Sequence, residues 1–163
     1  GQEGDIAVRI APARPVGLFE RYLNDERANA VAFRGDWYVT GDRAVRDDDG
    51  YLWFVARSDD VIKTSGYRVG PFEVESALLE HPAVAESAVV GVPDERIGQR
   101  IKAFVVLKPG IEGTAAMITA LQDHCKQITA PYKYPREIVF VTELPKTVSG
   151  KIRRNELRRQ SGG

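Results

Sequence analysis

Two different spacings of hydrophobic residues divide the second half of the chain into predicted helices and strands. Residues 71–80 carry apolar side chains at helical intervals behind a proline at the first helical position, and Thr114 can cap a second helix. The apolar face of this second helix consists of Ile118, Leu121, Cys125 and Ile128. Runs rich in apolar residues predict strands at 85–92, 101–107 and 137–141. The simplest arrangement is an α+β domain in which a mixed sheet of about three strands is backed by helices.

The first third of the chain opens with a short alternation of polar and apolar side chains, which is typical of a half-buried strand. Residues 5–10 predict one such strand, with no hairpin partner nearby, and residues 24–28 predict the start of a short helix. A hairpin is expected over residues 44–55, with its turn at three aspartates followed by Gly50. We therefore expect residues 1–56 to be rich in β-structure.

Composition indicates a globular chain without a strong preference for polyanions. Among 163 residues, 43% are hydrophobic, and 23 basic side chains balance 23 acidic ones. This neutrality argues against nucleic-acid or membrane-surface binding as the main task, and no apolar run is long enough to span a bilayer. The first residues do not resemble a signal peptide, and a single cysteine fits a reducing compartment. These features predict a cytoplasmic protein.

No metal site is predicted from the sequence. The acidic turn near Gly50 resembles a calcium loop, but Val45 and Ala56 occupy the first and closing ligand positions of that pattern. His81 and His124 have no acidic or cysteine partner at ligand spacing. Cys125 falls on the apolar face of a predicted helix, so we interpret it as a small core residue.

Residues 57–68 combine charge and backbone freedom at the boundary between the two halves. Two adjacent carboxylates, Asp59 and Asp60, stand among two arginines and a lysine, and Ser65-Gly66 follows them. This combination is more suitable for a pivot than for a core strand.

The C-terminal tail contains a lysine in a setting that favours contact with an anion. Lys151 follows Ser149-Gly150, but Pro145 and Ile152 replace residues that a phosphate-binding P-loop requires. A mobile Ser-Gly loop could instead carry the compact ammonium group to a phosphate or carboxylate. The arginines that follow predict a solvated basic end; they are Arg153, Arg154, Arg158 and Arg159.

Three segments together resemble ordered motifs of the adenylate-forming enzymes, which include acyl-CoA synthetases, peptide-synthetase adenylation domains and firefly luciferase. They are the Tyr-Val-Thr-Gly-Asp sequence at 38–42, the charged stretch at 57–68 and the tail at 144–154. The resemblance implies that residues 1–56 are the β-rich last segment of a large N-terminal AMP-binding domain that is truncated here. It implies a hinge at 57–68 and a mobile C-terminal domain at 69–163.

The same resemblance implies roles for individual residues. Asp42 would hold the ribose hydroxyls of ATP, accompanied by Arg57, and Arg68 would lie near the phosphates. Lys151 would bridge the substrate carboxylate and the α-phosphate while acyl-AMP forms, and Asp59 would be the hinge position. After the small domain turns, the loop at Ser65 and Gly66 would face the pantetheine thiol of CoA.

Residues 66–75 are similar to CoA ligases for acetate, medium-chain and aryl acids, so we expect a carboxylic acid, ATP and CoA as substrates. Mg²⁺ is expected with ATP, although no ligand for it is identified in this chain. The chain alone is expected to be inactive, since the family's phosphate loop and acyl pocket are absent. Residues 1–56 are expected either to be disordered or to associate with another chain. An exposed Lys151 would also be open to a lysine acyltransferase.

Three alternatives remain at this point. The chain could belong to an adenylation domain that transfers its product to a carrier protein. It could be a non-catalytic regulatory or docking module, although Asp42 and Arg57 would then have no task. The arginines at 153–159 could bind nucleic acid, although the neutral net charge and the lack of an aromatic platform disfavour this. The identity of the acid and the oligomeric state are not encoded in a recognisable way.

Overall fold

The computed structural model describes residues 1–162, and the chain divides into two compact units between Asp59 and Asp60. This division lies inside the stretch that we predicted as a hinge. The finer assignment of 1–56, 57–68 and 69–163 stays a prediction. Each unit is described by itself below.

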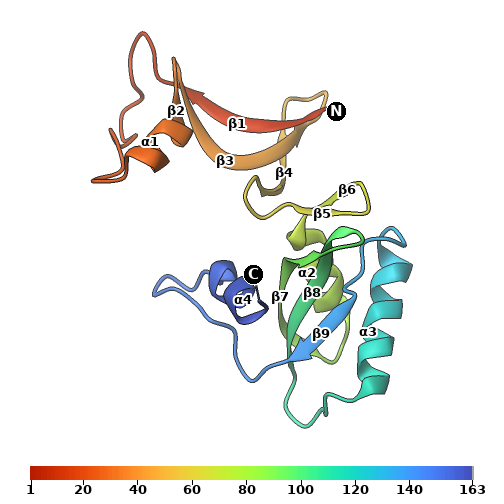
Figure 1. Ribbon diagram of the computed structural model, residues 1–163. Coiled ribbons are helices and arrows are strands. Elements are labelled where there is room, and N and C mark those ends of the chain that lie inside the picture. The colour runs from red at the N-terminus through yellow and green to blue at the C-terminus, as the bar shows by residue number, and fades with distance from the viewer. Residues whose placement is uncertain (163) are drawn as a thin grey trace. The chain divides into compact units, whose positions relative to one another are not determined.

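The first unit is an antiparallel sheet built around one long strand (Figure 1). Strand β3 (Trp37–Arg46) pairs with β1 (Glu3–Arg9) on one side and with β4 (Leu52–Arg57) and the short β2 (Phe33–Arg34) as its other partners. The predicted strand at 5–10 thus exists, and its partner is a strand distant in sequence. Of the two states expected for residues 1–56, disorder does not fit the paired sheet that these residues form, and association with another chain stays a prediction.

Local polar contacts explain the turns of this unit. Helix α1 (Glu26–Ala32) begins at Asp25, whose side chain accepts a hydrogen bond from the backbone N–H of Ala28. In the β3–β4 turn, the carboxylate of Asp47 accepts hydrogen bonds from the indole N–H of Trp53 and the backbone N–H of Tyr51. These bonds, the indole one most strongly, lower the pKa of the Asp47 carboxyl. The predicted hairpin is confirmed.

The first unit buries little apolar surface among its described residues. Its buried hydrophobic side chains are alanines, namely Ala32, Ala44 and Ala56. A group of aromatic rings in edge-to-face and tilted contact lies beside them; it consists of Phe19, Tyr22, Phe33 and Tyr38. Leu52, Trp53 and Phe54 of β4 are more than half exposed. This unit therefore presents an apolar strand to its surroundings.

The second unit contains a larger mixed sheet. Its centre is a long antiparallel hairpin of β7 (Val84–Asp94) and β8 (Gly98–Leu107), and β9 (Glu137–Phe140) joins β8 in parallel. A small hairpin of β5 (Ile62–Thr64) and β6 (Tyr67–Val69) extends the sheet through a bridge between Thr64 and Gly98. The predicted loop at 93–99 is shortened to a turn at 95–97, because β7 and β8 extend into it. The sheet has five strands where we expected about three, because β5 and β6 join it.

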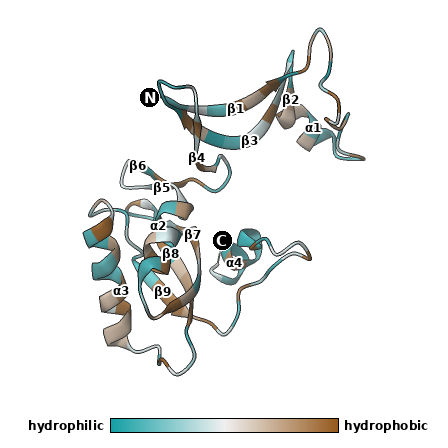
Figure 2. Ribbon diagram, turned by 180° about the vertical axis from the view of Figure 1, so that it is seen from behind, coloured by the Kyte–Doolittle hydropathy of each residue, from teal (hydrophilic) through white to brown (hydrophobic). Residues whose placement is uncertain are grey.

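Alternating side chains of the sheet supply two separate cores. Helices α2 (Pro71–Glu80) and α3 (Ala115–Ile128) cover one face, where Val89 and Val105 meet Leu78 and Leu121. Helix α4 (Arg154–Gln160) covers the opposite face, where its fully buried Leu157 packs with a second apolar group (Figures 1 and 2). The α+β class is confirmed. The sequence predicted helices α2 and α3 and did not predict α4.

Helix α3 confirms the interpretation of Cys125. Thr114 caps the helix by accepting a hydrogen bond from the N–H of Met117, and Leu121 and Cys125 are fully buried. Burial raises the pKa of the Cys125 thiol to about 11. Ile128, expected on the same face, is 44% exposed because the helix ends there. The thiol of Cys125 therefore reacts only when the second unit opens.

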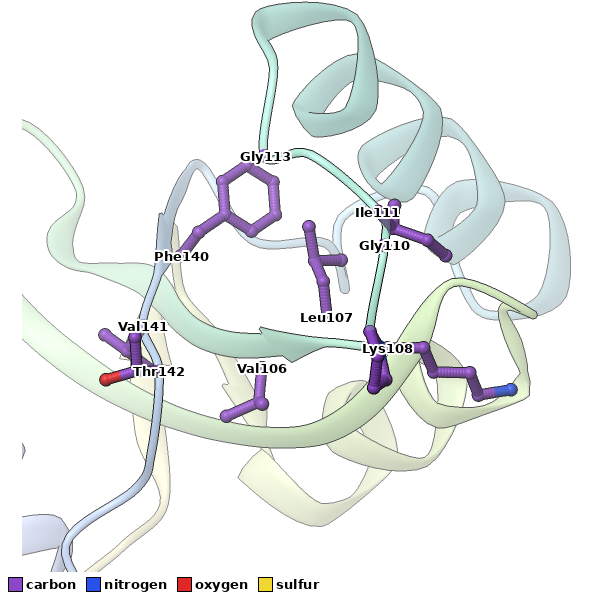
Figure 3. A pocket seen from close by; sticks show the side chains of 10 residues that line it. Val106, Leu107, Lys108, Gly110, Ile111, Gly113, Phe140, Val141 and Thr142 are labelled. Carbon is purple, nitrogen blue, oxygen red and sulfur yellow. The ribbon is translucent and has the colours of Figure 1, made fainter.

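The end of the second sheet contains one close packing contact without room for a side chain (Figure 3). The loop after β8 crosses the ring of Phe140, and a Cβ added at Gly113 would lie 2.3 Å from Cδ2 of that ring. Open space remains beside the contact, in a shallow pocket of about 430 Å³ lined also by Leu107 and Ile111.

Replacing Gly113 by alanine should therefore destabilise the second unit by about 1–3 kcal/mol through overpacking against Phe140. The rate at which a thiol reagent labels the buried Cys125 in mild denaturant measures how often the second unit opens. Gly4→Ala is the matched control, because a Cβ at Gly4 meets no atom within 4 Å. Equal labelling rates for Gly113→Ala and the wild type would contradict this packing.

Candidate functional site

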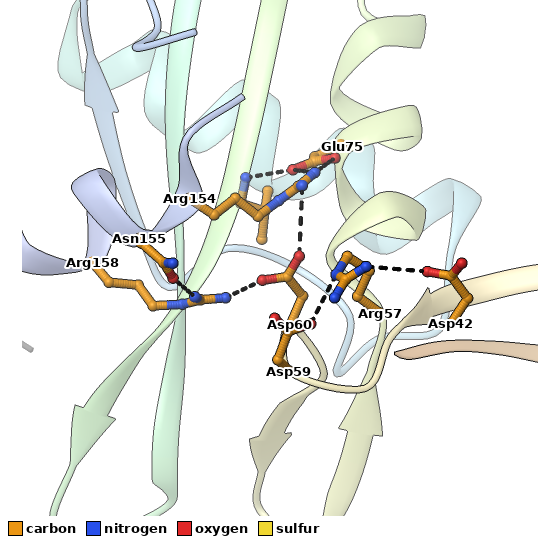
Figure 4. A network of polar contacts seen from close by, with 9 residues as sticks. Asp42, Arg57, Asp59, Asp60, Glu75, Arg154, Asn155 and Arg158 are labelled. Carbon is orange, nitrogen blue, oxygen red and sulfur yellow. Dashed lines mark hydrogen bonds and ion pairs between the residues drawn. The ribbon is translucent and has the colours of Figure 1, made fainter. Parts of the chain in front are cut away.

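Asp42 and Arg57 lie opposite each other on adjacent strands of the first unit. They are register partners in the β3–β4 ladder, and the Arg57 Nη1 atom lies 3.5 Å from the Asp42 Oδ1 atom (Figure 4). Both side chains are partly exposed, that of Arg57 at 49% and that of Asp42 at 38%. The two residues that the sequence suggested for a ribose thus form one cross-strand pair that solvent can reach.

The local backbone explains how this pair is held. Gly41 has a φ of +83°, and a Cβ there would lie 3.1 Å from the guanidinium of Arg57, so glycine lets that side chain lie along β3. The hydroxyl of Thr40 donates to the carbonyl of Ile6 and accepts a hydrogen bond from the N–H of Asp42. The Thr-Gly-Asp sequence therefore fixes the carboxylate by backbone geometry.

Asp59 lies at the last position of the first unit. Its carboxylate accepts a hydrogen bond of 3.0 Å from Nε of Arg57, and its side chain is 66% exposed. Arg57 therefore contacts both Asp42 and Asp59 within the first unit (Figure 4). An exposed residue with one weak ion pair has little to oppose a change of its backbone angles.

Ser65 and Gly66 form the two-residue turn of the β5–β6 hairpin. Both have positive φ, at 50° and 82°, which is the geometry of a tight hairpin turn. The N–H of Ser65 also donates to the carbonyl of Ile97. Arg68 is exposed on β6, opposite Lys63. These predicted residues belong to the second unit, whereas Asp42 and Arg57 belong to the first.

Lys151 is exposed in a short, closed hairpin of the second unit. Residues 146 and 152 form an antiparallel bridge at its base. Above the bridge, the hydroxyl of Thr147 accepts a hydrogen bond from the N–H of Lys151, and the N–H of Thr147 donates to the Lys151 carbonyl. Gly150 has a φ of +81° and allows the tight turn before the lysine. The loop expected to be mobile is thus an ordered hairpin with an exposed ammonium group.

The expectation of a solvated basic tail is wrong for Arg154 and Arg158. Arg154 contacts both carboxylate oxygens of Glu75, at 2.9 and 2.7 Å, and Arg158 is hydrogen-bonded to Asp60 (Figure 4). The side chains of Glu75 and Asp60 are only 7% and 11% exposed. The helical pattern of 71–80 contained a signal for this, since Glu75 lies next to the buried Val74 on an apolar helix.

A second group of arginines was not singled out from the sequence. Arg96, Arg100 and Arg136 line a cavity of about 410 Å³ together with Asp94 and Ile97. Arg100 is ion-paired with Glu137, and the guanidinium of Arg136 stacks on Tyr134 at 4.4 Å. The cavity therefore carries a positive excess that suits a phosphate group.

The histidines show no metal chemistry in the part of the chain that is described. His81 and His124 pack edge to face, with ring centroids 5.2 Å apart. Burial and the neighbouring His124 lower the pKa of His81. No group of three or more metal-binding side chains occurs among residues 1–162. No helix in that range is long and apolar enough to cross a membrane.

Comparisons with known proteins identify the class of protein. Residues 73–151 match the family described as AMP-binding enzyme C-terminal domain. In fold, the chain resembles the anthranilate CoA ligase AuaEII in complex with anthranoyl-AMP, with 43% identity over 99% of this chain and 30% of that one, and a TM-score of 0.83. ATP-bound MatB from Rhodopseudomonas palustris gives a TM-score of 0.83 at 31% identity, over 98% of this chain and 30% of that one. Residues 73–151 thus carry the sequence pattern of the C-terminal domain of AMP-binding enzymes.

Curated relatives narrow the assignment within this class. The chain is 59% identical over 162 residues to mitochondrial acyl-coenzyme A synthetase ACSM3 of Rattus norvegicus, covering 98% of this chain and 28% of that protein. It is 57% identical to the Homo sapiens ACSM3 protein, with the same coverage. Over its length it is similar to the C-terminal portion of these acyl-coenzyme A synthetases. The chain spans 28% of the length of these relatives.

The relatives also correct one expectation from the sequence. A single cysteine and a start without signal-peptide character suggested a cytoplasmic protein. This expectation is wrong, because the relatives of rat, mouse and human are named mitochondrial. Cysteine usage distinguishes reducing from oxidising compartments, and it does not separate one reducing compartment from another.

Proposed function

We propose that the whole protein to which this chain belongs activates a carboxylic acid with ATP and transfers the acyl group to CoA. The observation that carries the proposal is the division of charged groups between two units that meet between Asp59 and Asp60. The first unit holds the Asp42–Arg57 pair, and the second holds the exposed Lys151. The acyl-CoA synthetase names of the relatives support the same reaction.

In the first half-reaction, a carboxylate oxygen would attack the α-phosphorus of ATP, and pyrophosphate would leave. The Asp42 carboxylate can accept hydrogen bonds from both ribose hydroxyls, with Arg57 beside it. Lys151 would lie between the attacking carboxylate and the α-phosphate, where negative charge accumulates. Arg68 would lie near the phosphates. Mg²⁺ would arrive with ATP as part of the substrate.

In the second half-reaction, the thiol of CoA would attack the acyl carbonyl, and AMP would leave. Lys151 is assigned no role in this step, because the attack on phosphorus that it would assist is already complete. We infer that the second unit turns at Asp59, withdrawing Lys151 and bringing the turn of Ser65 and Gly66 toward the thiol. The ammonium group of Lys151 thus serves the first transition state, and the turn of Ser65 and Gly66 replaces it for the second, because negative charge develops at different atoms in the two steps.

The cavity of Arg96, Arg100 and Arg136 would bind phosphate groups of the CoA nucleotide. It lies on the second unit, which also carries the proposed thiol-facing turn. Several exposed guanidinium groups around one cavity are suited to a ligand with more than one phosphate. This contact would position CoA without entering the first half-reaction.

The other finer expectations become part of this proposal. The chain alone would be inactive, because it lacks the portion that makes up most of the relatives' length. A mitochondrial location is proposed from the relatives' names. Lys151 is exposed, so a lysine acyltransferase could neutralise it and stop adenylation. Transfer to a carrier protein and a pure docking role are the alternatives, and neither gives the arginine-lined cavity a role.

Replacing Lys151 by alanine in the whole protein should lower the rate of acyl-AMP formation about 10²–10³-fold, since the positive charge that stabilises the developing anion is removed. Thioester formation from supplied acyl-AMP should be unchanged. Pyrophosphate exchange into ATP measures the first step, and thioester release measures the second. Lys126→Ala, which removes an exposed lysine of α3, is the control. Equal losses of rate in both steps would argue against the proposed role of Lys151. The Lys151→Gln variant removes the same positive charge and therefore imitates neutralisation of the lysine by acylation.

Replacing Arg136 by alanine should raise the KM for CoA about tenfold, because a charged hydrogen bond to a phosphate is lost. The rate of pyrophosphate exchange should not change. Steady-state kinetics with varied CoA check both statements. Arg159→Ala is the matched control, since Arg159 is exposed at the end of α4. An unchanged KM for CoA would contradict the assignment of this cavity.

A further inference from the structure

A buried cluster of two acids and two arginines joins the start of the second unit to the segment directly after Lys151. Asp60 is the first residue of that unit, and Arg154 is the first residue of α4. Nη1 of Arg154 lies 3.7 Å from Oδ2 of Asp60, and Arg158 is hydrogen-bonded to the same carboxylate (Figure 4). Two residues that are far apart in sequence are therefore held together by charge.

The cluster extends into the core through Glu75 on α2. The Glu75 carboxylate accepts two hydrogen bonds from Arg154 and one of 2.8 Å from the backbone N–H of Val89 on β7. The acids are nearly buried, and the side chains of Arg154 and Arg158 are only 23% and 26% exposed. Charges in such surroundings need their partners, because removing one leaves another charge buried and unpaired.

The position of Lys151 depends on this cluster through a short and closed piece of chain. The hairpin that carries Lys151 ends with a hydrogen bond from the N–H of Arg153 to the carbonyl of Pro145, and α4 starts at the next residue. The direction in which the hairpin projects is thus set by the anchoring of Arg154. Two other anchors contribute, namely the buried Leu157 and the ion pair of Lys146 with Glu86.

We propose that Asp60 is a positioning residue for Lys151, acting through Arg154 and Arg158. The cluster makes the hairpin part of one rigid body from the first residue after Asp59. A turn at Asp59 then moves the ammonium group of Lys151 by a defined path to a defined place. Without the carboxylate of Asp60, the hairpin samples more orientations, and only a fraction of molecules has Lys151 in the competent position. This inference rests on the proposed function.

The kinetic test is the Asp60→Asn substitution in the whole protein. Pyrophosphate exchange should fall about 10- to 100-fold, because displacing a catalytic group by about 1 Å can cost that much. Thioester formation from supplied acyl-AMP should not change, and Asp60→Glu should restore part of the exchange rate. Asp123→Asn is the control, since it removes an exposed acid paired with Lys126 on α3. Equal losses in both half-reactions, or no loss in exchange, would overturn the proposal.

A double substitution separates positioning from general stability. In a protein that already carries Lys151→Ala, the Asp60→Asn substitution should cause no further loss of pyrophosphate exchange, because the ammonium group that Asp60 positions is absent. If the fold-losses of pyrophosphate exchange caused by the two substitutions multiply in the double variant, Asp60 acts by a route that does not involve Lys151. If Asp60→Asn does not fold, Arg158→Gln perturbs the same carboxylate from the exposed side, and the same pair of outcomes applies to it.

A measurement on the present chain does not depend on catalysis. Amide hydrogen exchange at Lys151 and Arg153 should be faster in Asp60→Asn than in the wild type, whereas exchange at Ala103 in the central strand should be unchanged. Faster exchange in the hairpin together with a whole protein that forms no thioester would support the cluster and reject the proposed function. Unchanged exchange in the hairpin together with an active ligase would reject the cluster's role and leave the function standing.

Discussion

The ion pairs of Arg154 with Glu75 and Asp60 are the interaction on which the second unit's geometry depends. They join the start of that unit, its first helix and its last helix at one place (Figure 4). Apolar packing fixes the sheet between α2, α3 and α4, but α4 buries only one large side chain, Leu157, among its seven residues. A helix of that length is marginal without tertiary contacts. The ion pairs therefore hold α4 in place, because the hydrophobic core contacts this helix mainly through Leu157.

The first unit illustrates the opposite situation. Its sheet is well paired, but the buried hydrophobic residues among those described are three alanines, and β4 leaves Leu52, Trp53 and Phe54 largely exposed. Such a surface is expected where a sheet continues into a larger domain. The relatives' greater length is consistent with this, since the chain spans 28% of them. The pair of Asp42 and Arg57, which we propose to contact the nucleotide, nevertheless lies entirely within the unit, because both residues belong to neighbouring strands.

Sequence periodicity predicted those elements whose residues carry their own signal. Helix α3 has a capping threonine and a regular apolar face, and β7 and β8 are rich in apolar residues. It did not predict α4, because Arg154 and Arg158 look like solvated charges until Glu75 and Asp60 are brought to them by the fold. The arginine-lined cavity was missed for the same reason. Arg136 comes from a segment distant in sequence from Arg96 and Arg100, and only the sheet brings them together.

We propose that the second unit turns as one body at Asp59 between the two half-reactions. Spin labels at Asp49→Cys and Glu112→Cys in the whole protein, both exposed positions in different units, would report this turn as a distance. The buried Cys125 would stay unlabelled. The account predicts one distance with a non-reactive acyl-AMP analogue and a different one after CoA is added. A single distance that neither ligand changes would contradict it.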